Sequence, residues 1–237
     1  METSYEKRMQ ALKKLAFEAN MFLSSYGLAT LTWGNASVRD KKRDRVAIKP
    51  SGVAYAALTP EAMVVIDTHG KVVEGALRPS SDTPTHLFLY RAFPEIGSIV
   101  HTHSRWATIW SQMQRPIPVL GTTHADHFNG EVPCTRPLTV KETAGEYEKA
   151  TGEAIAEAFA SLDPLCLPAA LVAGHGPFVW GRDWKSAVAN AVALEEVAMM
   201  AWHTLMARPD ASLPLHIAVR HFARKHGSDA TYGQKQS

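Results

Sequence analysis

Three histidines are the residues of this sequence whose types and spacing best suit metal chemistry. His101 and His103 are one residue apart and follow the apolar pair 99–100, and His175 follows the apolar run 170–173. Side chains alternate between the two faces of a strand, so a His-x-His pair places both imidazoles on one side. A third imidazole from another strand end would complete the three protein ligands and open position of catalytic zinc. The alternative is that these histidines are interior residues with hydrogen-bonded ring nitrogens.

Glycines on both sides of His175 favour the metal interpretation. Gly174 and Gly176 leave this turn bare of side chains. Glycine lets the backbone approach another group closely or adopt dihedral angles that other residues avoid. We therefore expect the turn to hold His175 against another part of the site.

Four short segments are rich in small polar residues. Each one alone is typical of a turn, because Gly, Ser, Asn and Pro suit turn backbones. Together they predict an anion cradle, since hydroxyls and backbone amides bind phosphate, especially at a helix N-terminus such as the one expected after Ser81. Lys49 would add a positive charge, although it could instead be a solvated lysine at a strand end. The segments are 32–35, 49–52, 79–82 and 121–126.

Composition excludes several classes of protein. The 237 residues fit one large domain or two small ones, and the 25 basic and 23 acidic residues form no basic stripe, so no nucleic-acid partner is expected. Cys134 and Cys166 form no CxxC motif, which favours a reducing cytoplasm over a disulfide framework. No membrane partner is expected either, because the most apolar late segment, 187–206, is interrupted by Glu195 and Glu196.

Hydrophobic periodicity predicts alternating helices and short strands. Thr83 and Pro84 are typical of a helix start. Such alternation favours a layered α/β domain with a mixed sheet. Helices are expected over about 12–27, 83–93, 105–112, 145–160, 184–206 and 215–225, and strands over 29–33, 45–48, 64–66, 72–73, 98–100, 169–173 and 178–180.

The motifs, taken in order, resemble the class II aldolase/adducin family and, within it, the L-ribulose-5-phosphate 4-epimerases. The resemblance implies one domain over residues 1–237, folded as a three-layer α/β/α sandwich with a mixed, largely antiparallel central sheet. It also implies a homotetramer with sites at subunit boundaries, in which segment 215–237 packs at a subunit interface. The matching segments are 31–35, 48–53, 79–86, 100–104, 121–126, 175–178, 224–227 and 232–234.

The same resemblance implies a role for individual residues. Asp126 and Tyr232 match the pair that moves protons on the two faces of the substrate. The metal would be Zn²⁺, one per subunit, with other divalent ions as alternatives. The implied metal ligands are Asp82, His101, His103 and His175. The implied contacts to substrate and phosphate are Gly34, Asn35, Lys49, Ser51, Gly52, Ser80, Ser81, His221 and Arg224, the last two from a segment that covers a neighbouring subunit's site.

Three positions bear on the reaction. Asp82 stands where the related phosphosugar aldolases carry glutamate, which favours the epimerase branch. Ala173 replaces a histidine that often precedes the third metal ligand, and His127 replaces a phenol after Asp126. The implied reaction inverts carbon 4 of L-ribulose 5-phosphate, a phosphorylated ketopentose, to give D-xylulose 5-phosphate by retro-aldol and aldol steps.

Two other functions remain open from the sequence. One is a zinc phosphosugar aldolase of the fuculose or rhamnulose phosphate type, which would share the metal and phosphate groups. The other is a non-catalytic, adducin-like binding domain, but such domains have lost the metal ligands that are present here. His86, expected in the first turn of a helix, is interpreted as a packing residue and not as a ligand.

Overall fold

Seven strands form one sheet in the computed structural model, which describes residues 3–42, 44–227 and 230. The strand order is β4-β3-β2-β1-β5-β7-β6, and every pair of neighbouring strands is antiparallel. The one parallel pairing among the described residues is an isolated bridge between Cys134 and Leu171. The strands are β1 (Asn35–Asp40), β2 (Arg45–Ile48), β3 (Val64–Asp67), β4 (Val72–Glu74), β5 (Ser98–His101), β6 (Ala169–Val172) and β7 (Gly176–Gly181).

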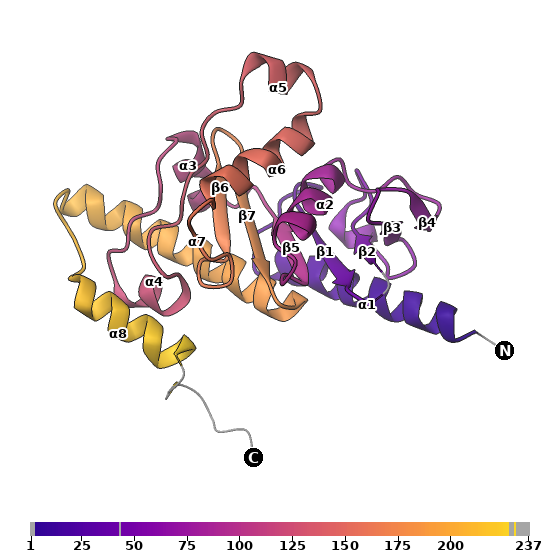
Figure 1. Cartoon of the computed structure of the whole chain (residues 1–237), viewed down its shortest axis with the longest axis horizontal. Helices are drawn as coiled ribbons and strands as arrows, with labels where there is room; N and C mark the ends of the chain where they lie inside the picture. Colours follow the sequence, from indigo (N-terminus) through magenta and orange to yellow (C-terminus); the bar gives the residue numbers. More distant parts are fainter. Residues whose placement is uncertain (1–2, 43, 228–229, 231–237) are drawn as a thin grey trace.

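Helices cover both faces of this sheet, which confirms the predicted three-layer α/β/α sandwich (Figure 1). Ser37 on β1 contacts His86 and Tyr90 of α2 through its hydroxyl. The next side chain, Val38, points the other way and packs in a buried cluster with Leu12 of α1. The helices are α1 (Ser4–Ser25), α2 (Thr83–Ala92), α3 (Arg105–Gln112), α4 (Thr122–His127), α5 (Val140–Ala144), α6 (Tyr147–Ala158), α7 (Trp184–Ala207) and α8 (Leu215–His226), with a short 3₁₀ turn, η1 (Tyr55–Ala57).

The long helix α7 lies against β5 and β7 with its small residues buried. Alanines at 187, 191, 198 and 201 are all at most 4% exposed, so the helix approaches the sheet closely. Glu195 interrupts this apolar helix for a structural reason, because its carboxylate accepts hydrogen bonds from the backbone amides of Trp106 and Ala107 at 2.9 and 3.0 Å. It thereby satisfies two of the free N–H groups at the start of α3. None of the described helices is both long and apolar enough to cross a membrane.

The sequence-based prediction of a strand over 29–33 is wrong. Leu31 and Gly34 have φ angles of 55° and 78°, in the left-handed region, so the chain turns here and β1 begins only at Asn35. Helices α4 and α5 were not predicted. Helix α5 begins with a capping box between Thr139 and Glu142, and the helix predicted from residue 145 begins at Tyr147.

Candidate functional site

The three histidines of the predicted metal site lie together at one edge of the sheet. His101 is the last residue of β5, His103 lies two residues further on, and His175 lies in the turn between β6 and β7. One ligand nitrogen from each lies within 4.8 Å of the other two, and the Nε2 atoms of His101 and His103 are 3.2 Å apart. Antiparallel pairing of β5 with β7 and of β7 with β6 brings the strand ends together.

The ring of His101 is held on two sides. Its Nδ1 lies 3.0 Å from the carbonyl oxygen of Pro177, and the ring stacks on Phe178, its partner across the strands, with 4.2 Å between centroids. Because a carbonyl only accepts, Nδ1 carries the proton and Nε2 is left with a lone pair toward the other histidines. The backbone that presents His103 is fixed by the following helix α3, whose first amides Glu195 binds.

Two glycines make this close arrangement of backbones sterically feasible. A Cβ at Gly34 would lie 2.7 Å from the carbonyl oxygen of His101, and a Cβ at Gly176 would lie 2.6 Å from that of Thr102. Gly34 also has a φ of 78°. Any other residue at these positions would push the histidine-bearing backbone away.

Desolvation favours the neutral form of all three imidazoles, including that of His103, which is exposed to solvent at one side. Desolvation lowers the pKa of His101 to about 3, and desolvation is also the main cause that lowers the pKa values of His103 and His175. A histidine must be neutral to bind a metal, so protons compete weakly for these nitrogens.

Asp82 lies at the N-terminus of α2 but does not cap it. Its carboxylate makes no capping hydrogen bond and instead accepts one from Asn35 Nδ2 at 2.7 Å, while Asn35 pairs with His101 across β1 and β5. Burial would raise the pKa of Asp82, but the nearby His101 and His86 and the bond from Asn35 outweigh it and hold the pKa below its usual range. The carboxylate lies outside the 4.8 Å group of histidine nitrogens.

One pocket of about 380 Å³ contains all of these groups. The pocket also contains every residue of the three small-residue segments before residue 83 that the family resemblance implies as a contact to substrate or phosphate. Asn35 contributes a buried side-chain oxygen, Oδ1, that has no hydrogen-bond partner among the described residues. The lining residues are Thr32, Trp33, Gly34, Asn35, Lys49, Pro50, Ser51, Gly52, Ser80, Ser81, Asp82, His101, His103 and His175.

Lys49 supplies a buried positive charge to this pocket. The residue is only 2% exposed, which rules out the alternative of a solvated lysine. Its ammonium contacts the carbonyl oxygens of Thr32 and Pro50 at 3.4 and 3.5 Å and lies 4.9 Å from the ring centroid of Tyr55. Burial lowers its pKa, and no carboxylate of a described residue lies within 4.0 Å. A buried ammonium without a counter-ion favours an anionic ligand.

The other predicted residues lie in a separate cluster between α4 and α8. Asp126 on α4 accepts two hydrogen bonds from Arg224 and contacts His221 Nδ1 at 3.0 Å, and none of the three lines the histidine pocket. Figure 1 shows α8 lying beside α4. Burial raises the pKa of Asp126, but the bonds from Arg224 and His221 outweigh it and hold the pKa below its usual range. Tyr232 lies outside the described residues.

Comparison with protein families decides the classification. Residues 14–202 match the model of the class II aldolase and adducin N-terminal domain. The chain belongs to this family.

Solved structures of family members share the fold. An L-fuculose 1-phosphate aldolase has 24% identity and a TM-score of 0.77, with 94% of this chain and 97% of that chain covered. The L-fuculose-1-phosphate aldolase of Thermus thermophilus has 28% identity and a TM-score of 0.65, with 86% of this chain and 98% of that chain covered. YgbL of Klebsiella pneumoniae, a candidate aldolase/epimerase/decarboxylase, has 27% identity and a TM-score of 0.72. The comparison covers 90% of this chain and 98% of that chain.

Tyr147 is a residue of the site that the sequence reasoning missed. Its hydroxyl lies 3.5 Å from His175 Nδ1, although 28 residues separate the two in the chain. The sequence predicted a helix near this position, but no motif singled out the tyrosine. His86 behaves as expected for a packing residue, since it is fully buried and its Nδ1 lies 2.7 Å from the hydroxyl of Ser37.

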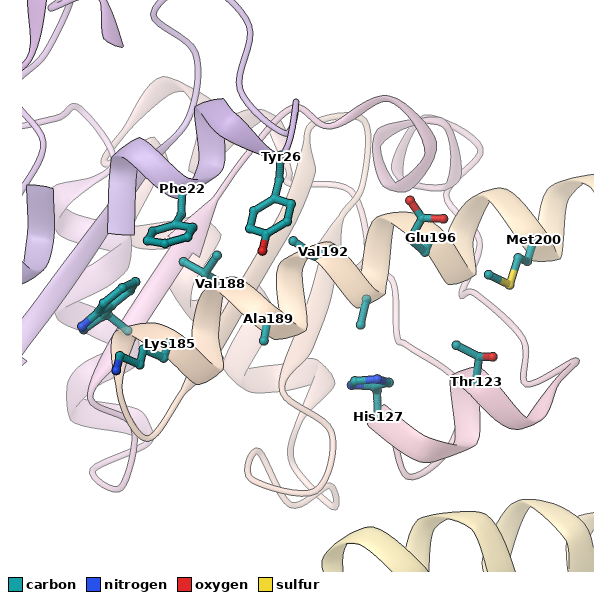
Figure 2. Close-up of a pocket in the computed structure, with 12 residues that line it drawn as sticks. Phe22, Tyr26, Thr123, His127, Lys185, Val188, Ala189, Val192, Glu196 and Met200 are labelled. Atoms are coloured by element: carbon teal, nitrogen blue, oxygen red, sulfur yellow. The ribbon is translucent and has the colours of Figure 1, made fainter. Parts of the chain in front are cut away.

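A second, apolar cavity of about 520 Å³ lies between α1, α4 and α7 and shares no lining residue with the histidine pocket. Figure 2 shows Phe22 of α1 and Tyr26, the residue that follows α1, facing Val188 and Val192 of α7, with His127 of α4 further along. It contains none of the residues predicted to hold metal or substrate. Its walls offer few polar groups for a sugar phosphate.

Proposed function

We propose that this family member is a metal-dependent enzyme that breaks and re-forms a carbon–carbon bond of a phosphorylated ketose. The specific reaction proposed is 4-epimerisation of L-ribulose 5-phosphate to D-xylulose 5-phosphate. The observation that carries the proposal is the pocket that combines three converging imidazoles with a buried lysine that has no carboxylate partner among the described residues. Metal and phosphate sites side by side suit a substrate with a carbonyl at one end and a phosphate at the other.

The donor set fits Zn²⁺. The nitrogens of His101, His103 and His175 converge within 4.8 Å, and three nitrogen ligands with an open position are typical of catalytic zinc. Asp82, beside them, is proposed as a fourth contact to the metal or its water. One ion per subunit would supply a Lewis acid for the oxygens of the ketose, and other divalent metals suit the same nitrogens.

The phosphate is assigned to the part of the pocket lined by Lys49 and the serines. Lys49 would give the charge, and Ser51, Gly52, Ser80 and Ser81 would give hydroxyl and backbone N–H donors. A phosphate held here keeps the released fragment in place during the reaction. This retention is what separates an epimerase from an aldolase.

The chemistry requires bond cleavage because the hydrogen on carbon 4 is not acidic when the ketone is at carbon 2. A base removes the proton of the carbon 4 hydroxyl, and the bond between carbons 3 and 4 breaks. Its electron pair stays on carbon 3 as part of an enediolate, and carbon 4 becomes the aldehyde of glycolaldehyde phosphate. After the aldehyde rotates, carbon 3 attacks its other face and the new alkoxide takes up a proton.

We assign the two proton transfers to Asp126 and Tyr232, one on each face. Asp126 is an ionised carboxylate and can accept a proton, and the hydrogen bonds from Arg224 and His221 that lower its pKa also make it a weaker base than a free carboxylate. A tyrosine, with a pKa near ~10, suits protonation of an alkoxide. Because Asp126 does not line the histidine pocket of its own chain, we propose that it serves the pocket of a neighbouring subunit in a homotetramer.

Exposed apolar side chains support this assembly. Phe22, Tyr26 and Met200 in the α1–α7 cavity are 41%, 57% and 45% exposed, and Leu215 and Val219 on α8 are 78% and 56% exposed. Mixing two inactive variants tests the sharing of sites. His103→Ala and Asp126→Asn protomers, each inactive alone, should regain activity when co-assembled, because some pockets then carry both wild-type residues. Absence of regained activity in proven mixed oligomers would place Asp126 outside a shared site.

An aldolase is the second candidate, because two of the similar solved structures are L-fuculose 1-phosphate aldolases. It would use the same metal and phosphate groups but release its aldehyde. Asp82, shorter than the glutamate of the related aldolases, favours the epimerase. A metal-free, adducin-like binding role is disfavoured by the three converging histidines.

A coupled assay tests the proposal. Purified protein is mixed with L-ribulose 5-phosphate, and D-xylulose 5-phosphate is followed before chelation, after chelation and after zinc is added back. Metal-dependent product without free glycolaldehyde phosphate is expected. Accumulation of free aldehyde, or turnover only with fuculose 1-phosphate, would instead identify an aldolase.

A further inference from the structure

The start of α6 is fixed beside the start of α2 by contacts that the proposed chemistry does not use. The hydroxyl of Thr85 on α2 donates to the carbonyl oxygen of Glu148 at 2.5 Å. A turn further on, the two helices approach so closely that a Cβ at Gly152 would lie 2.8 Å from the Cβ of Phe88. These contacts hold the start of α6 against α2, the helix that Asp82 precedes.

Tyr147 is the first residue of α6, so this packing places it at the histidine edge of the sheet. Its hydroxyl lies 3.5 Å from His175 Nδ1, and the two ring centroids are 6.2 Å apart. The backbone at Tyr147 is also held, because its carbonyl oxygen accepts a hydrogen bond from the hydroxyl of Thr151 at 2.9 Å. No other side chain of a described residue makes a hydrogen bond to His175.

Tyr147 contacts the Nδ1 atom of His175 and not its Nε2 atom. His101 is held in the same way, through Nδ1, by the carbonyl oxygen of Pro177. In both histidines Nε2 is then the nitrogen left for a metal. A neutral imidazole that binds a metal through Nε2 carries its proton on Nδ1, and this proton needs an acceptor. The phenolic oxygen of Tyr147 can accept it.

We propose that Tyr147 is a positioning residue of the metal centre, which accepts the Nδ1 proton of His175 and so fixes the tautomer and orientation in which His175 binds zinc. This inference rests on the proposed metal site. Tyr147 does not itself bind the metal, and it has no place in the proton transfers assigned to Asp126 and Tyr232.

Zinc affinity measured by competition with a chromophoric chelator tests the inference. Removal of a hydrogen-bond partner behind a metal-binding histidine typically weakens metal binding by about 10- to 100-fold, and Tyr147→Phe should do the same. Tyr26→Phe removes a tyrosine hydroxyl from the apolar cavity between α1 and α7 and should leave the zinc affinity unchanged. The thermal midpoints of the metal-free proteins should agree, because the phenyl ring of the variant keeps its packing.

A second readout does not depend on the variant. In zinc-loaded wild-type protein with ¹⁵N-labelled histidine, the spectrum should show His175 protonated at Nδ1 and bound through Nε2. Binding through Nδ1 would overturn the inference, as would equal zinc affinities for wild type and Tyr147→Phe. Failure of wild type to bind zinc would overturn the metal site of the proposed function as well. Zinc binding by wild type with no effect at Tyr147 would overturn only the role of the tyrosine.

Discussion

Arg224 and Asp126 form a two-point contact between α8 and α4. Arg224 Nε lies 3.1 Å from Asp126 Oδ1, and Arg224 Nη2 lies 2.7 Å from Oδ2. Helix α8 has no fully buried residue, so these polar contacts, with those of His221 and His226 to Asp126, contribute much of what fixes it on α4. The carboxylate that we assign to catalysis is therefore also the anchor of the C-terminal helix.

The position of α8 should depend on the charge of Asp126. The folded-state pKa of this carboxyl is depressed, so its contribution is present above the unfolded pKa near ~4 and is lost as pH falls through the folded value. Asp126→Asn should remove the contribution at neutral pH. Hydrogen exchange at pH 7 should then speed up over residues 215–226 and remain unchanged in α1. Equal protection in wild type and variant would show that apolar contacts hold the helix.

Removal of one histidine should separate metal binding from folding. His103 is exposed, so His103→Ala should change the free energy of unfolding of the metal-free protein by no more than about 0.5 kcal/mol while abolishing stoichiometric zinc. His101 is buried, stacked on Phe178 and bonded to Pro177, so His101→Ala should lose zinc and also unfold more easily. Elemental analysis and urea titration measure the two effects. Stoichiometric zinc in His103→Ala would contradict the assigned ligand set.

Stability of the metal-free protein should fall as the solution is acidified below pH ~6.5. Burial lowers the pKa of His101 to about 3 and those of His86 and His124 to about 4, so the unfolded chain binds protons that the folded chain does not. Between its unfolded and folded pKa values, each such group lowers the free energy of unfolding by up to about 1.4 kcal/mol for every pH unit of acidification. Urea midpoints at pH 7 and pH 5 measure how steeply stability depends on pH. His86→Asn should reduce this dependence. A slope of zero would mean that these rings take up protons in the folded state.

Most strands and the His101–His103 pair were accessible from the sequence because they depend on local pattern, whereas the approach of His175 depends on the pairing of β5 with β7 and of β7 with β6. Strand β2 coincides with the predicted residues 45–48, and the glycines around His175 indicated a close backbone contact that the structure confirms at Gly176. The turn at 29–33 was misread as a strand, because its apolar residues match a strand pattern and only the backbone angles distinguish the two.

The contacts of Tyr147 and Glu195 could not be predicted from sequence. Each depends on packing between helices that are far apart in the chain, α2 with α6 and α3 with α7. No residue type near either position signals its partner. The sequence of segment 49–52 is compatible with either a solvated or a phosphate-binding Lys49, since burial is a property of the whole fold and not of the segment.

Lys49 offers a test of the phosphate site that does not threaten the fold. Its ammonium is buried and meets no carboxylate in the part of the chain that the structure describes, so Lys49→Met removes a desolvation cost and should leave the protein at least as stable. Loss of a charged hydrogen bond worth about 1.5–3 kcal/mol should raise KM for a sugar phosphate by about 10- to 100-fold. The matched control is Lys185→Met, which replaces an exposed lysine of the apolar cavity and should leave KM unchanged. An unchanged KM would remove Lys49 from the phosphate site.

A pair of glycine variants can show whether the backbone contact at Gly34 is needed for the metal site. Gly27 and Gly34 have similar φ angles of 70° and 78°, but a Cβ at Gly27 meets nothing within 4 Å, whereas one at Gly34 would lie 2.7 Å from the carbonyl oxygen of His101. Gly27→Ala should therefore cost only the left-handed backbone penalty of about 1–2 kcal/mol and keep its zinc affinity.

Gly34→Ala should cost about 1–3 kcal/mol more than Gly27→Ala, since overpacking must displace the backbone of His101. It should also weaken zinc binding, because that displacement moves one of the three nitrogens relative to the other two. Urea unfolding and a zinc competition titration on both variants measure the two effects. If both variants lost the same stability and kept wild-type affinity, the edge of the sheet would be yielding enough to absorb a methyl group, and the arrangement of the histidines would not depend on the missing side chain of Gly34.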